Sequence, residues 1–216
     1  MQRSALQKIC DKIREAFDAK DEAREKGLTL SREVIRNSAN AIRAIHRGEF
    51  AQAEGLLAQS VKMIQQVGKA LREHPDVLNA GFFQDAQKEH AEALITLALI
   101  RGEPVPDPDR IKVEYAPYLG GLAEAVGELR RHILDRVRKK DSAWGEEMLA
   151  VMDDIYYQLV SFDYPAAISG NLKRTTDVTR SILEKTRGDL TNALRQNRLQ
   201  RALREAAHGA GEDAEE

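Results

Sequence analysis

The sequence has few residues of the types that build disulfide-rich, secreted or membrane-spanning proteins. Cys10 is its single cysteine, which excludes an intramolecular disulfide and a cysteine-based zinc site and is typical of a reducing compartment. The longest apolar run, Ala93 to Ile100, contains Thr96 and is far shorter than the roughly 20 residues that a membrane span needs. Because residues 1–4 also lead directly into charged sequence without an apolar signal core, we expect a cytoplasmic protein.

Turn-forming and aromatic residues are also scarce, with 14 Gly, 6 Pro and 5% aromatics. This composition disfavours a turn-rich β fold, while 42% hydrophobic residues exclude a disordered chain, so helix is the expected structure. The 33 basic and 35 acidic side chains leave a formal charge of −2. No global basic field therefore attracts nucleic acid or an anionic membrane, and any such partner must bind through local charge.

The apolar residues recur at helical spacing along most of the chain. They predict six helices, over about residues 6–46, 49–73, 76–100, 115–140, 148–162 and 171–207. The first segment is either one long helix or two helices broken at Gly27. The end of the third, residues 93–100, is apolar all round and should be buried on every side.

These segments predict an all-α bundle of about six to seven helices, in a single domain over residues 1–207. Residues 208–216 form an acidic tail that we expect to be disordered. At about 1.5 Å per residue, an unbroken first helix would be about 60 Å long, more than a compact bundle of this size can cover. Its remaining apolar stripe predicts an oligomer.

Four glutamates are spaced in a way that indicates a chemical function. Glu89 and Glu92 are three residues apart on one predicted helix, and Glu124 and Glu128 are four apart on another, so each pair lies on one helical face. Converging carboxylates favour Mg²⁺ or Mn²⁺, which activate water and neutralise the developing charge of a phosphodiester. A solvated polar face is the other interpretation, because Glu124 and Glu128 lie about 160° from their helix's apolar stripe. A ferritin-like di-iron site is disfavoured, since it needs a Glu-x-x-His on two helices.

Other residues indicate structural roles. Gly120 and Gly121 lie within a helical pattern and favour close helix packing over a phosphate loop. The basic final helix suits nucleic acid, a solvated surface or a subunit contact. The five histidines never pair at metal-ligand spacing, so we expect surface or helix-end positions for them: His46, His74, His90, His132 and His208.

Residues 118–131, with the sequence YLGGLAEAVGELRR, resemble the "YLxGxADxxGELxR" core of the translin family. The chain is most similar to archaeal-type homologues, which are closer to translin-associated factor X than to translin. Shorter matches support the resemblance at residues 31–33, 44–49, 162–165 and 184–190.

This resemblance implies an all-α fold of about seven helices, a closed octameric shell with an internal cavity, and binding of single-stranded RNA or DNA. For the factor X branch it also implies metal-dependent endoribonuclease activity. The acidic site then maps to Glu89 and Glu92, from "ExxE", and to Glu124 and Glu128, from "DxxGE". Glu124 stands where the family most often has Asp, and its extra methylene lengthens the arm that would reach one metal position.

The resulting hypothesis is that these four glutamates hold one or two Mg²⁺ or Mn²⁺ ions, which orient water for in-line attack on single-stranded RNA. Basic side chains near the cavity would bind the RNA backbone, and the candidates are Lys88, Arg131, Arg43, His46 and Arg47. Two alternatives stay open. One is a non-catalytic, translin-like shell that binds single-stranded RNA or DNA, and the other is a purely structural helical protein.

Overall fold

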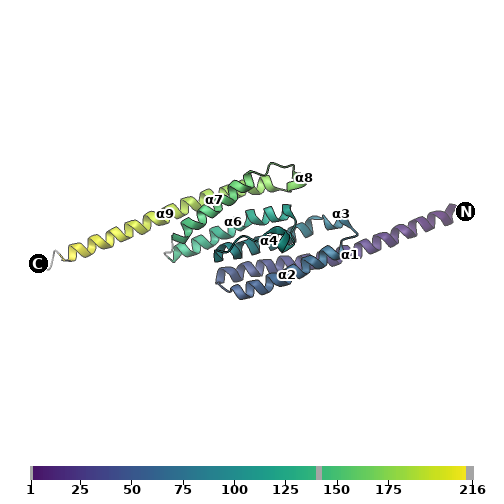
Figure 1. Ribbon diagram of the computed structural model, residues 1–216, viewed down its shortest axis with the longest axis horizontal. Helices are drawn as coiled ribbons and strands as arrows, with labels where there is room; N and C mark the ends of the chain where they lie inside the picture. The colour runs from purple at the N-terminus through teal and green to yellow at the C-terminus, as the bar shows by residue number, and fades with distance from the viewer. Residues whose placement is uncertain (1, 140–142, 213–216) are drawn as a thin grey trace. The chain divides into compact units, whose positions relative to one another are not determined.

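A computed structural model describes residues 2–139 and 143–212. Over these residues the chain forms nine helices and no strand, which confirms the all-α class (Figure 1). Six helices are long, as the sequence predicts, and three are single turns of four residues: α3 (Pro75–Leu78), α5 (Pro108–Ile111) and α8 (Ala166–Ser169). The chain divides into two compact units, Met1–Gly121 and Leu122–Glu216.

In the first unit, α1 (Gln2–Arg47) and α2 (Phe50–Ala70) lie side by side as an antiparallel pair (Figure 1). Helix α1 runs through Gly27 without a break, so the alternative of two helices is wrong. A Cβ atom at Gly27 would lie 3.0 Å from Leu71 Cδ1, so this glycine permits close packing inside the unit. The turn to α2 uses Gly48, whose φ of 78° is in the left-handed region that favours glycine.

The third helix, α4 (Gly81–Arg101), packs on both α1 and α2. The sequence places its start at Asp76, and this is wrong. The short helix α3 comes first, and Ala80 then adopts an extended conformation, with ψ 147°, before α4 begins. The side-chain Nδ2 of Asn79 donates to the carbonyl of Pro75 at 2.8 Å and completes α3 as a separate turn. Residues 93–100 are largely buried, as expected.

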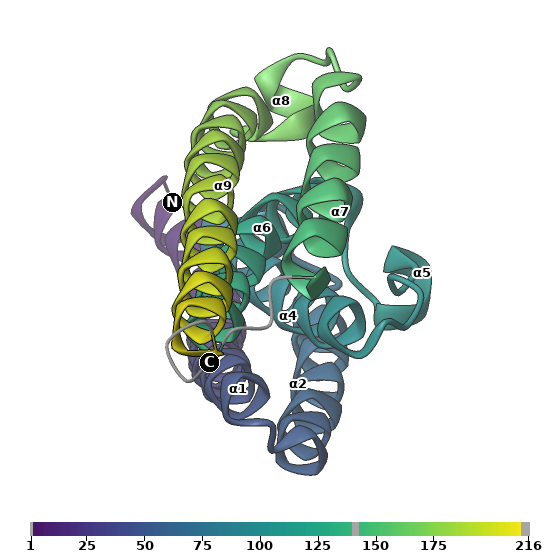
Figure 2. The same ribbon diagram turned by 90° about the vertical axis from the view of Figure 1, so that its left-hand side faces the viewer.

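In the second unit, α7 (Ala143–Val160) packs on α9 (Leu172–Glu212), and α8 lies at the turn between them (Figure 2). Arg187 of α9 donates to both carboxylate oxygens of Asp153 on α7, at 2.8 and 2.7 Å. The hydrogen bonds and charge of Asp153 raise the pKa of the Arg187 guanidinium above its ordinary value. Helix α9 continues through Glu212, into the tail that we expected to be disordered, and residues 213–216 lie outside the described part.

Long exposed faces remain on both of the longest helices. The N-terminal part of α1 exposes Leu6, Ile9, Ile13 and Phe17, each by 47% or more. Beyond residue 190, α9 exposes Leu199, Leu203 and its arginines. Within the described residues, no helix is long and apolar enough to cross a membrane.

Candidate functional site

The candidate site begins where α6 (Tyr115–Arg138) meets α4. A Cβ atom added at Gly121 would lie only 2.7 Å from the backbone nitrogen of Glu92 and 2.7 Å from the carbonyl oxygen of Lys88. Real Cβ atoms essentially never come this close, so only glycine allows this contact. The predicted role of Gly121 in close helix packing is therefore confirmed, and the contact falls on the turn of α4 that carries Glu89 and Glu92.

Glu124 follows Gly121 by three residues on the same uninterrupted helix, so it lies one turn beyond the contact. One carboxylate oxygen from each of Glu89, Glu92 and Glu124 lies within 4.8 Å of the others. Glu92 is only 9% exposed, and Glu89 and Glu124 are half-buried. Three like charges held this close repel one another, and a cation relieves that repulsion.

The donor set fits a hard divalent cation. Its ligands are all carboxylate oxygens, the type that Mg²⁺ and Mn²⁺ prefer over the nitrogen and sulfur ligands of zinc. Mg²⁺ keeps several water ligands, so three carboxylates leave coordination positions open for other oxygen ligands. The group of Glu89, Glu92 and Glu124 could therefore bind a metal ion.

The fourth predicted ligand, Glu128, is not a member of this group of described residues. It lies four residues after Glu124 on α6, and its side chain is 23% exposed. Its Oε2 lies 3.8 Å from a guanidinium nitrogen of Arg131. The structure thus brings three of the four predicted carboxylates together and places Glu128 one turn further along, beside a predicted RNA-binding arginine.

The predicted RNA-binding residues occupy several places. Lys88 Nζ lies 3.6 Å from Glu89 Oε1, next to the carboxylate group. Arg43, His46 and Arg47 lie in the last turns of α1, where Arg43 donates to Asn40 Oδ1 at 2.5 Å. Arg47 donates to Glu49 Oε2 at 2.7 and 3.0 Å. These bonds raise the pKa of Arg47 and lower that of Glu49, so the pair is charged at neutral pH.

His90 differs from the surface or helix-end histidine that we expected. It is fully buried, and among the described residues neither ring nitrogen has a hydrogen-bond partner. Burial lowers its pKa from 6.5 to about 4, so the ring is neutral at pH 7. The side chains of His46, His74 and His132 are partly exposed, as predicted, and that of His208 lies outside the described residues.

Helical spacing explains why His90 is buried although Glu89 is partly exposed. On α4 it lies between Ala86 and Ala93, which belong to two different apolar clusters. Ser38 of α1 and Ser60 of α2 occupy the same position between those clusters on their own helices, and both are fully buried. The three residues form a small polar layer, which the histidine count alone does not reveal.

Comparison with known proteins tests the family resemblance. No protein-family model matches the sequence. An uncharacterized protein of Methanocaldococcus jannaschii is 32% identical over 201 residues, which cover 90% of this chain and 86% of that protein. Among solved structures, AfC3PO is 33% identical, with a TM-score of 0.79 over 85% of this chain and 96% of that chain.

Two further structures agree with this result. AfC3PO in complex with duplex RNA is 32% identical, with a TM-score of 0.76 over 85% of this chain and 95% of that chain. Apo-NeC3PO, at 17% identity and a TM-score of 0.77 over 85% of this chain and 96% of that chain, shows the fold alone. Identity above 30% over nearly the whole of AfC3PO, the shared all-helical fold and the motif at residues 118–131 together show that this chain belongs to the translin family.

Proposed function

We propose that this chain is a single-stranded nucleic-acid-binding protein of the factor X branch, with metal-dependent endoribonuclease activity on single-stranded RNA. The observation that carries the proposal is the carboxylate group of Glu89, Glu92 and Glu124, with oxygens within 4.8 Å of one another. Translin proper lacks the full acidic set, whereas this chain has a carboxylate at all four matching positions, with Glu124 in place of the usual Asp.

In this proposal the three carboxylates, with Glu128 one turn away, hold one or two Mg²⁺ or Mn²⁺ ions. A bound cation supplies Lewis acidity toward the phosphodiester and lowers the pKa of water. The chain's own residues position the substrate. Lys88, held beside Glu89, offers an ammonium to a phosphate oxygen, and Arg131, beside Glu128, offers a guanidinium.

The RNA partner is supported by the AfC3PO structure solved with duplex RNA. Contacts from Lys88, Arg131, Arg43, His46 and Arg47 to phosphates carry little sequence information, so binding should depend on salt and hardly on base order. A single strand is the proposed substrate because its flexible backbone can fit the phosphate to the carboxylate group.

We also propose that the protein forms a homo-oligomeric closed shell, an octamer by family resemblance. The exposed stripe of Leu6, Ile9, Ile13 and Phe17 recurs every three to four residues along α1. An apolar stripe of this length on a single helix indicates a protein contact. Within such a shell, a polar surface turned away from the subunit core can line the cavity.

The test is cleavage of labelled single-stranded and duplex RNA with Mg²⁺, Mn²⁺ or EDTA. We expect cleavage of the single strand only with metal, and its loss in Glu89→Gln, Glu92→Gln and Glu124→Gln. Glu124→Asp, which restores the usual family residue, should stay active. Glu147→Gln changes an exposed glutamate outside the group and is the matched control.

Cleavage that ignores EDTA and all three substitutions would remove the proposed site. Binding of the RNA without cleavage in any metal would favour the alternative, a non-catalytic translin-like shell that binds single-stranded RNA or DNA. Absence of both binding and cleavage would leave a structural helical protein. Calorimetric titration with Mn²⁺ separates failed metal binding from failed chemistry.

A further inference from the structure

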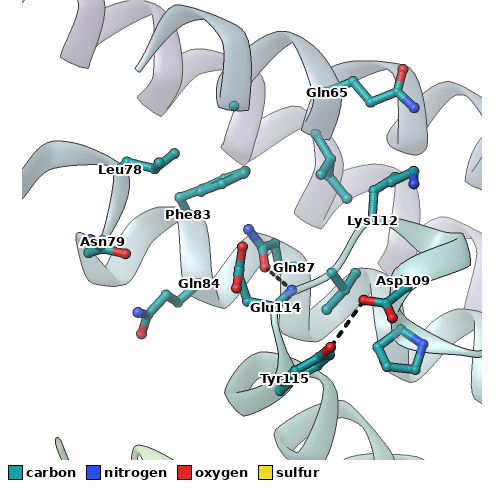
Figure 3. Close-up of a pocket in the computed structure, with 14 residues that line it drawn as sticks. Gln65, Leu78, Asn79, Phe83, Gln84, Gln87, Asp109, Lys112, Glu114 and Tyr115 are labelled. Carbon is teal, nitrogen blue, oxygen red and sulfur yellow. Dashed lines mark hydrogen bonds between the residues drawn. The ribbon is translucent and has the colours of Figure 1, made fainter. Parts of the chain in front are cut away.

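A second site lies within the first unit, in a pocket of about 550 Å³. Side chains from α2, the end of α3, α4, α5 and the start of α6 line it, and Figure 3 shows how they surround the space. Its volume is within the range of roughly 300–1,000 Å³ that is usual for small-molecule sites. Its walls are rich in amide side chains, which are Gln65, Asn79, Gln84 and Gln87.

Gln87 gives the pocket a fixed hydrogen-bond donor. The side chain is 3% exposed, and its Oε1 accepts a hydrogen bond from the backbone N–H of Glu114 at 2.8 Å (Figure 3). Because that bond engages the oxygen, the amide orientation is set and Nε2 remains as the donor. Among the described residues Nε2 has no hydrogen-bond partner. Nε2 is open to the pocket, where a ligand can accept a hydrogen bond from it.

The other walls offer two flat rings and two acceptors. Phe83 is 5% exposed and forms an apolar wall, whereas Tyr115 is 65% exposed at the rim. The Tyr115 hydroxyl donates to Asp109 Oδ1 at 3.4 Å, and the charge of Asp109 raises the pKa of the phenol (Figure 3). The carboxylates of Asp109 and Glu114 line the same pocket and can accept hydrogen bonds from a ligand amine.

We propose that this pocket binds a nucleobase with an exocyclic amine, carried by a nucleoside monophosphate. The base would stack on Tyr115, accept from Gln87 Nε2 and donate its amine to a carboxylate. Lys112 also lines the pocket, and its ammonium would pair with the phosphate. Adenine and cytosine have the required acceptor beside an amine, whereas uracil has no amine.

The pocket is distinct from the carboxylate group. Gln87 and Glu89 are two residues apart on α4, which places them about 200° apart around the helix axis. A metal site is also disfavoured in the pocket, because Lys112 opposes a cation there. Binding to the pocket therefore does not rest on the proposed nuclease, and it can be measured in EDTA.

Calorimetric titration with AMP, CMP and UMP, in EDTA, tests the proposal. We expect saturable binding of AMP and CMP and at least tenfold weaker binding of UMP, because uracil has a carbonyl oxygen, an acceptor, in place of the amine that would donate to the carboxylate. Tyr115→Ala should weaken AMP binding by about tenfold through loss of stacking. Tyr157→Ala is the matched control, since Tyr157 is 68% exposed and lies in the second unit.

Gln87→Glu keeps the acceptor for the Glu114 N–H and removes the donor, so it should weaken AMP binding by about tenfold. Thermal unfolding of each variant identifies any loss of folding. Because Tyr115 is exposed, Tyr115→Ala should not change the unfolding temperature much. Oligo(A) and oligo(U) hexamers distinguish the source of the base. If AMP does not bind but oligo(A) responds to Tyr115→Ala, the pocket takes a base within a strand.

Three results would overturn the inference. The first is equal binding of AMP and UMP. The second is binding of AMP and oligo(A) that neither Tyr115→Ala nor Gln87→Glu changes. The third is failure of the unsubstituted protein to bind AMP, CMP or oligo(A) in the pocket while it still cleaves RNA, which would leave the nuclease proposal intact.

Discussion

Substitution of Gly121 by alanine tests whether the close contact of α6 with α4 builds the carboxylate group. The added Cβ would lie 2.7 Å from two backbone atoms of α4, whereas ordinary contact begins at 3.4 Å. Backbone atoms cannot rotate away as a side-chain tip can, so the helices must separate by several tenths of an ångström. Overpacking of this kind costs about 1–3 kcal/mol.

Gly127→Ala is the matched control, because Gly127 lies on the same helix and a Cβ there meets only Ile182 Cδ1, at 3.9 Å. In a helix interior alanine is favoured over glycine by about 1 kcal/mol, and this gain applies to both variants. The free energies of unfolding of the two variants should therefore differ by the steric cost alone, about 1–3 kcal/mol in favour of Gly127→Ala.

Urea unfolding followed by circular dichroism measures this difference, and titration with Mn²⁺ measures its effect on the site. We expect Gly121→Ala to bind Mn²⁺ more weakly than Gly127→Ala, because separation of the helices moves Glu124 away from Glu89 and Glu92. If Gly121→Ala is as stable as Gly127→Ala and binds Mn²⁺ equally well, the contact at Gly121 does not position the carboxylates.

Two further predictions concern His90 and the exposed stripe of α1. Burial lowers the pKa of His90 to about 4, so below pH 6.5 the unfolded chain binds a proton that the folded chain excludes. The free energy of unfolding should fall between pH 6.5 and pH 4, by about 2 kcal/mol at pH 5. Urea unfolding should show a smaller fall in His90→Leu. An equal fall in this variant would contradict the conclusion that the buried His90 ring causes it. The double substitution Ile9→Glu and Ile13→Glu should lower the mass of the assembly measured by light scattering, whereas Leu199→Glu, at an exposed leucine of α9, should not. An unchanged mass in the double variant would exclude the α1 stripe as the contact.

The sequence by itself determined the helical class and most of the long helices, because these depend on local spacing and on breakers. Apolar residues at helical spacing predict α6 and α9, and Gly48 marks the end of α1. The close approach at Gly121 is also predictable, since a glycine inside a helical pattern costs stability unless packing requires it. The identity of the candidate ligands follows from their spacing and the family motif.

Only the tertiary structure decided which residues from distant parts of the sequence lie in the same environment. Helix α1 continues through Gly27 because Leu71, 44 residues later, packs against that position. His90 is buried because its position on α4 lies between two apolar clusters, and the burial of its ring lowers its pKa. The pocket around Gln87 joins segments that are up to 51 residues apart, from Ile64 to Tyr115. Such contacts depend on how helices pack in space, which the spacing of residues within one helix does not specify.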